Sequence, residues 1–157
     1  MNNVIFKHNM NEEMEFLNKY TDIVHNAKQF ALRKAANVVK DATISSFKKT
    51  GIKYGPNPLY NDTLIDAIRT SKIFADTVKV HIMGVRSKKS GTFRLRFFEN
   101  GTKDRYQTSY NGQPLKKKRK LGHIKAYNFF ESAKAGAIRE AEQTFTEMFD
   151  KYIERNS

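Results

Sequence analysis

Residues 16–42 carry apolar side chains at spacings of three and four, which is the pattern of a helix with one apolar face. The stripe comprises Phe16, Leu17, Tyr20, Ile23, Val24, Ala27, Phe30, Ala31, Ala35, Val38, Val39 and Ala42. Asn9 and Glu12 have the spacing of a capping box, and Gly51 is placed to end the helix. The pattern predicts a long N-terminal helix. A break near residues 21–22, which would divide it in two, is the alternative.

A second helical stripe lies near the end of the chain. It comprises Phe129, Phe130, Ala133, Ala137, Ile138, Ala141, Phe145, Met148, Tyr152 and Ile153. These residues predict a C-terminal helix that, at about 1.5 Å per residue, reaches about 40 Å and lies across a small sheet. A short helix is predicted between the two stripes, capped by Asp62 or Thr63 and running through Leu64, Ile65 and Ile68.

Two segments in the middle of the chain, residues 77–85 and 93–99, alternate apolar and polar side chains as strands do. The apolar members are Val78, Val80 and Ile82 in the first segment, and Phe93, Leu95 and Phe97 in the second. Residues 87–91 form a polar connection of hairpin length, so we expect the two strands to pair antiparallel. Asn100-Gly101 ends the second strand, because this pair adopts the positive φ of a tight turn at low cost.

Two further segments are predicted to be irregular. Residues 51–61 hold two prolines, each of which disfavours helix in the residue before it. Residues 103–120 lack apolar periodicity and contain Asn111-Gly112, so we expect a long exposed loop or an extended hairpin. The predicted fold class is therefore α+β, with a long N-terminal helix and a C-terminal helix packed on a small antiparallel β-sheet that carries a long basic loop.

The length of 157 residues suits one domain over residues 1–157, and segments 1–10 and 103–121 are expected to be flexible. Lysine and arginine number 29 against 16 aspartate and glutamate, a net charge of +13. Such an excess favours contact with a polyanion, most commonly nucleic acid. The alternative is a basic surface that serves solubility or meets an acidic protein.

Composition also limits the cellular setting. Mean hydropathy is −0.69 and no apolar run approaches the roughly 20 residues that cross a bilayer, so we expect a soluble protein without a membrane partner. Residues 1–10 lack the pattern of a signal peptide, so export by that route is not expected. The absence of cysteine excludes disulfides and thiolate metal sites, and it is consistent with a reducing cytoplasm.

The sequence offers no catalytic residues, no metal ligands and no cofactor site to name. The histidines His8, His25, His81 and His123 have neither metal-ligand nor triad spacing. Glu99, Asp104 and Arg105 are better explained by a charged turn with a local ion pair than by a catalytic carboxylate beside a phosphate-binding arginine. We therefore expect no enzyme, and a small nuclease is the weaker alternative.

The basic run Lys116, Lys117, Lys118, Arg119 and Lys120 is the most distinctive local feature. It matches the residue pattern of a nuclear localisation signal, although nothing else in the sequence indicates a nuclear protein. It is equally compatible with a solvated loop that has no specific role. As a phosphate-contacting loop it would bind DNA without sequence preference, with a slope of about −0.9 per phosphate in log affinity against log salt.

Two aromatic pairs, Phe97-Phe98 and Phe129-Phe130, are candidates for core positions. In each pair we expect one ring to point inward and the other to be available to a neighbouring subunit. Burying one phenylalanine contributes about 1.5–3 kcal/mol, so a second exposed ring is unusual in a monomer.

Four segments in this order resemble the tail-component family of long-tailed phages, typified by the lambdoid Hong Kong-type phages. They are residues 30–39, residues 63–68, the Phe-Phe-Glu-Asn-Gly-Thr of residues 97–102, and residues 126–133. The third matches the family's aromatic-Glu-x-Gly-Thr signature through Glu99, Gly101 and Thr102. The fourth corresponds to a Pro-Phe-Leu-x-Pro-Ala segment whose prolines are missing here.

The resemblance implies a structural virion protein that acts in the neck or in tail completion. Copies, six by family analogy, would form a ring between connector and tail tube, after assembly in the host cytoplasm. Glu99 to Thr102 would then hold a turn at a subunit contact. From the charge we add that Lys116 to Lys120 face the channel and meet passing double-stranded DNA non-specifically. The alternative function is a free-standing, sequence-independent nucleic-acid-binding protein.

Overall fold

The computed structural model describes residues 10–53, 63–82 and 92–156. Helix α1 spans Met10–Lys49 and helix α3 spans Phe129–Asn156. Between them lie the 3-10 helix η1 (Leu64–Ala67), strands β1 (Arg69–Thr70) and β2 (Val80–His81), the 3-10 helix η2 (Thr92–Arg94), helix α2 (Leu95–Asn100), and strands β3 (Arg105–Tyr110) and β4 (Gln113–Gly122). Two long helices and two small antiparallel ribbons make an α+β fold, which confirms the predicted fold class.

Helix α1 is continuous over 40 residues, so the prediction of a long N-terminal helix is confirmed and the alternative break near residues 21–22 is wrong. Thr21 is accommodated inside the helix, where its hydroxyl donates to the Leu17 carbonyl oxygen one turn earlier, at 2.8 Å. Gly51 follows the helix end with a φ of 73°, as expected of a C-terminal stop. The predicted cap at Asn9 lies outside the described residues.

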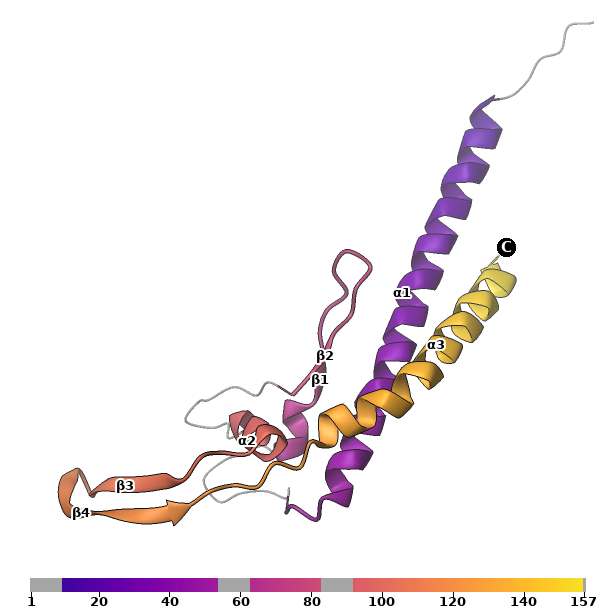
Figure 1. The fold of residues 1–157 in the computed structure, drawn as a ribbon. Helices are drawn as coiled ribbons and strands as arrows, with labels where there is room; N and C mark the ends of the chain where they lie inside the picture. Colours follow the sequence, from indigo (N-terminus) through magenta and orange to yellow (C-terminus); the bar gives the residue numbers. More distant parts are fainter. Residues whose placement is uncertain (1–9, 54–62, 83–91, 157) are drawn as a thin grey trace, which may run out of the picture.

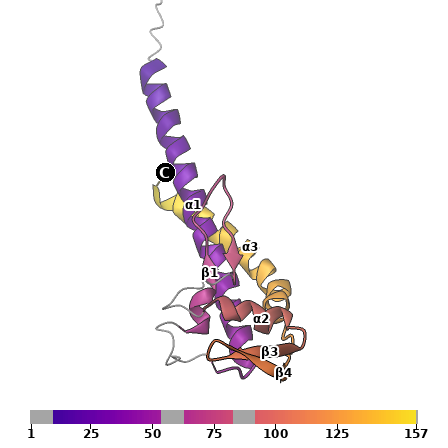
Figure 2. The same cartoon turned by 90° about the vertical axis from the view of Figure 1, so that its left-hand side faces the viewer.

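Helix α3 packs along α1 rather than across a sheet, as Figures 1 and 2 show. The ring centroids of Phe47 and Phe129 are 5.0 Å apart, and those of Phe30 and Tyr152 are 5.7 Å apart. The start of α3 therefore meets the end of α1, and the two helices run antiparallel. Both contribute small buried residues to the contact, namely Ala27 and Ala31 with Ala133, Ala137 and Ala141. Small side chains let two helices approach closely, so this alanine-lined face explains why α3 packs against α1.

The hydrophobic core lies at one end of the helix pair. It joins the end of α1, η1, α2 and the start of α3 through Phe47, Leu64, Ala67, Ile68, Leu95 and Phe129. The predicted short helix is confirmed, with Thr63 as its cap. The backbone N–H and the hydroxyl of Thr63 both donate to the Asp66 carboxylate, at 2.7 and 3.0 Å.

Residues 93–99 form helical turns, so the predicted strand is wrong. Leu95 and Glu99, four residues apart, are the buried members of α2. A run of seven residues fits both a period of two and a period near 3.6, and burial against the core selects the helical one. Gly101 still supplies a positive φ of 70° after the segment, as the Asn-Gly pair suggested.

The predicted pairing of residues 77–85 with residues 93–99 is also wrong. Strand β2 pairs antiparallel with β1, so that Thr70 lies opposite Val80. A tight turn closes this hairpin, and its residues Ala75 and Asp76 both have positive φ. Alanine is not a typical residue for that conformation, although aspartate adopts it more readily, so the pair Ala75-Asp76 is a weak turn signal. Residues 87–91, expected to connect the strands, lie outside the described residues.

Candidate nucleic-acid interface and assembly junction

The segment after α2 and the segment before α3 run side by side, and we call this contact the junction. The backbone N–H of Tyr127 donates to the Phe98 carbonyl at 2.9 Å, and that of Asn128 donates to the Glu99 carbonyl at 3.2 Å. Thr102 and Ile124 then exchange two bonds of 2.9 Å, one of them through the Thr102 hydroxyl oxygen. The third and fourth segments of the family resemblance, about 30 residues apart in sequence, are thus in direct contact.

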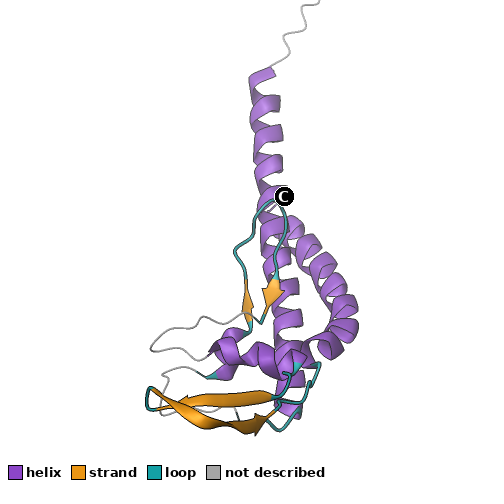
Figure 3. Ribbon diagram, turned by 60° about the vertical axis from the view of Figure 1, so that its left-hand side comes forward, coloured by secondary structure: helices purple, strands orange, loops and turns teal. Residues whose placement is uncertain are grey.

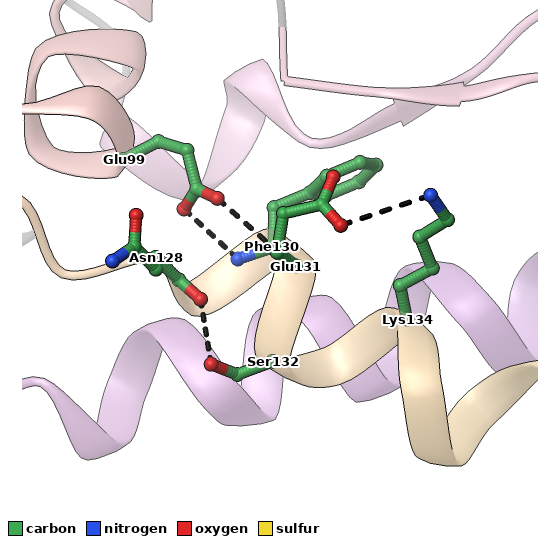
Figure 4. Close-up of polar contacts among 6 residues, drawn as sticks. All are labelled: Glu99, Asn128, Phe130, Glu131, Ser132 and Lys134. Carbon is green, nitrogen blue, oxygen red and sulfur yellow. Dashed lines mark hydrogen bonds and ion pairs between the residues drawn. The ribbon is translucent and has the colours of Figure 1, made fainter.

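Glu99 is the centre of the junction (Figure 4). The residue is 5% exposed, and its carboxylate accepts the backbone N–H of Phe130 on Oε2 at 2.9 Å and that of Glu131 on Oε1 at 3.2 Å. These are among the first N–H groups of α3, which have no partner inside the helix. The negative charge also lies at the positive end of the helix dipole. Glu99 therefore caps α3 from a different helix.

Gly101 lets the two segments of the junction approach. A Cβ atom at this position would lie 2.9 Å from the backbone nitrogen of Ala126 and 3.0 Å from the carbonyl oxygen of Ile124. Both are backbone atoms, which cannot rotate away as a flexible side chain does. The φ of 70° adds a second requirement for glycine. The glycine of the Glu-x-Gly-Thr pattern is thus explained by contacts within one chain.

The aromatic pairs lie on both sides of the junction. Phe129 is 1% exposed and packs on Phe47, whereas Phe130 and Phe98 are partly buried against the same core. Phe97 is half-buried and meets the Phe93 ring edge-on at a centroid distance of 6.0 Å. In the pair Phe129-Phe130 one ring, that of Phe129, is buried, as expected. A role of the half-buried rings in subunit contacts stays a prediction.

Strands β3 and β4 form a ribbon that starts from the junction and extends away from the helix pair (Figures 1 and 3). The turn residues Asn111 and Gly112 have φ of 49° and 80°, which is the conformation that Asn-Gly favours in a hairpin. Of the two alternatives for residues 103–120, the extended hairpin is confirmed. Asp104 holds the base of the ribbon through Lys120 at 2.7 Å and His123 at 3.5 Å.

The basic run lies on this ribbon. The register places Ser109 opposite Pro114 and Gln107 opposite Arg119, so the intervening residues of β4, 115–118, bulge from the ladder. Lys116, Lys117, Lys118 and Arg119 are exposed, and none has an acidic partner among the described residues. Lys120 differs because Asp104 neutralises it. Four uncompensated cations on an extended ribbon are suited to phosphate contacts.

Other chemistry is sparse in the described part of the chain. Residues 10–53, 63–82 and 92–156 contain no cluster of three or more His, Cys, Asp or Glu side chains that could hold a metal ion. Within the same ranges, no helix combines the length and the apolar character needed to span a membrane. Glu99 and Asp104, considered for a catalytic site, are engaged in the helix cap and in the pair with Lys120. His8 lies outside the described residues.

The sequence did not indicate that Glu99 caps α3. Asn128 and Glu131 have the spacing of a local capping box, but the Glu131 carboxylate lies 3.7 Å from Lys134 instead. The carboxylate of Glu99 caps the helix in place of that of Glu131. A pattern of neighbouring residues cannot reveal a cap that comes from a distant part of the chain. No family model matches the chain, and neither a curated protein nor a solved structure matches it significantly.

Proposed function

We propose that this chain is a structural protein of a tailed phage virion, forming a ring at the head-to-tail neck or the tail terminus through which DNA passes. The observation that carries the proposal is the β3–β4 ribbon, where Lys116 to Arg119 are exposed and lack acidic partners among the described residues. The order of the four resembling segments supports the virion setting. The neighbours would be connector and tail-tube proteins, and no catalysis is part of the proposal.

The junction supports a mechanical role for this ribbon. Glu99 ties α2 to the start of α3, and Thr102 with Ile124 ties together the two chain segments that lead into the ribbon. The base of the ribbon is therefore fixed to the core. In a ring, repeated ribbons would line the channel with positive charge. Contacts to phosphates alone suit that task, because a base-specific grip would stall moving DNA.

Neutralising the basic run is expected to abolish most binding to double-stranded DNA. The variant Lys116→Gln, Lys117→Gln, Lys118→Gln and Arg119→Gln should lower the slope of log affinity against log salt by up to about 3.6, at about 0.9 per lost phosphate contact. Fluorescence anisotropy on a labelled duplex between low and moderate salt measures this slope. The matched control neutralises four exposed lysines elsewhere, Lys49, Lys53, Lys72 and Lys79. Equal losses in both variants would show that only net charge matters.

Self-assembly is expected to separate this proposal from its alternative. Native mass spectrometry and negative-stain microscopy of the DNA-free protein should detect closed rings, of six copies by family analogy. A protein that changes mass only when DNA is added would instead favour a free-standing nucleic-acid-binding protein. That alternative has its own support, since Tyr106 and Tyr110 on the ribbon are 52% and 64% exposed and could stack on bases.

A further inference from the structure

The first part of α1 carries an apolar face that no described segment covers. Every residue from 13 to 22 is exposed, including Met14 at 59%, Phe16 at 68% and Leu17 at 60%. Tyr152 near the end of α3 packs on Phe30, so α1 continues past its partner helix, as Figures 1 and 2 show. We call residues 13–22 the overhang. Its stripe continues the one that α3 buries further along α1, and exposed large apolar groups in such a row indicate a binding surface.

The charges along α1 are segregated. The overhang carries Glu13, Glu15 and Asp22 against a single lysine, Lys19. The helix from residue 23 to its end carries Lys28, Arg33, Lys34, Lys40, Lys48 and Lys49 against a single acid, Asp41. A second α1 placed parallel would bring acid against acid, whereas an antiparallel one brings acid against base. The charge pattern therefore selects an antiparallel copy.

A groove suited to the overhang lies where α3 ends. It has a volume of about 450 Å³ and is lined by Phe30, Met148, Lys151, Tyr152, Arg155 and Asn156. Its apolar members match the overhang's apolar face. Arg155 lines it as well, as does Lys151, which also pairs with Glu147 at 3.9 Å, and the Lys34 ammonium lies 5.3 Å from the Phe30 ring centroid. An apolar groove with basic neighbours is complementary to an acidic helix with an apolar stripe.

We propose that two copies of this chain pair antiparallel through α1, each placing its overhang in the other's groove beside Phe30 and Tyr152. Overhang and groove belong to one continuous surface, so the contact is two-fold and self-complementary. The apolar faces of both overhangs are therefore covered by the same contact. The pairing goes beyond the proposed function, because a two-fold pair is not a ring and needs neither DNA nor a virion. It leaves the β3–β4 ribbon uncovered.

Sedimentation velocity of the full chain over a range of concentrations tests the pairing. The unaltered protein should sediment as pairs, or as assemblies built from pairs. The variant Leu17→Glu with Tyr20→Glu should associate at least about 30-fold more weakly, the size of effect expected of central interface residues. Phe74→Glu is the control, since Phe74 is 84% exposed but lies on the β1–β2 hairpin. Circular dichroism checks that each variant keeps its helices.

A charge swap tests direction and register. Glu13→Lys with Glu15→Lys should weaken the pair, as should Lys151→Glu with Arg155→Glu, and the chain carrying all four changes should recover. In a parallel pair, residues 13 and 15 of one chain would face residues 13 and 15 of the other. Combining the four changes would then not restore the association. A monomeric unaltered protein overturns the proposal and leaves the overhang to a different protein. Failure here and failure of the proposed function are distinguishable, since pairs that never close into rings would support the pairing and contradict the ring, whereas rings that persist in the Leu17→Glu, Tyr20→Glu variant would do the reverse.

Discussion

Replacing Gly101 by alanine is expected to destabilise the fold by about 2–4 kcal/mol, the sum of a positive-φ penalty and an overpacking penalty. The new Cβ would lie 2.9 Å from the Ala126 nitrogen and 3.0 Å from the Ile124 carbonyl oxygen. Relief requires the two segments of the junction to separate, which weakens the bonds between Thr102 and Ile124. Urea denaturation followed by circular dichroism measures the loss. The thermal midpoint should fall in parallel.

Gly112→Ala is the matched control for this change. Gly112 also has a positive φ, of 80°, but a Cβ there meets nothing within 4 Å. Alanine at position 112 should therefore cost only about 1–2 kcal/mol, which is the conformational part alone. If the two variants lost equal stability, the close approach at Gly101 would not be the reason for its glycine.

Replacing Glu99 by alanine is expected to remove about 2–4 kcal/mol of stability. The change deletes two charge-assisted hydrogen bonds and leaves the N–H groups of Phe130 and Glu131 without their acceptor in a partly buried position. Glu99→Gln should lose less, because one amide oxygen still accepts. The free energy of unfolding gives the size of the effect. Faster hydrogen exchange of the Phe130 and Glu131 amides would locate it at the helix start.

Glu131→Ala is the control for the cap. Glu131 lies in the same first turn of α3, but its exposed carboxylate is only 3.7 Å from Lys134 in a surface pair. Such pairs contribute about 0–1 kcal/mol, so this variant should remain close to the unaltered protein. Equal losses at positions 99 and 131 would contradict the assignment of the cap to Glu99.

The two junction variants also connect the fold to the proposed function. The ribbon that carries Lys116 to Arg119 is joined to the core through Thr102 and Ile124. Loosening the junction should let the ribbon move without changing its charge. DNA affinity of the isolated chain should then change little, whereas ring formation should suffer. Comparing the two readouts separates positioning of the ribbon from its electrostatics.

The candidate site was predictable from the sequence only in part. An exposed basic segment, as a loop or an extended hairpin, followed from Asn111-Gly112 and the run of cations, because both act locally, and the structure selects the hairpin. The junction did not, because Glu99 and the amides that it caps are about 30 residues apart. The glycine and glutamate of the Glu-x-Gly-Thr pattern were recognised as a turn, but the structure gives them separate tasks, close approach and helix capping.

By itself, the sequence determined the two long helices, the short helix near Thr63 and the reversal of the chain at Asn111-Gly112. A helical stripe repeated over many turns, or a residue pair with a strong conformational preference, needs no distant partner to be decisive. Tertiary structure alone decided that residues 93–99 are helical, that β2 pairs with β1 and that α3 follows α1. Short apolar runs fit two periods equally well, and burial against a particular neighbour selects between them.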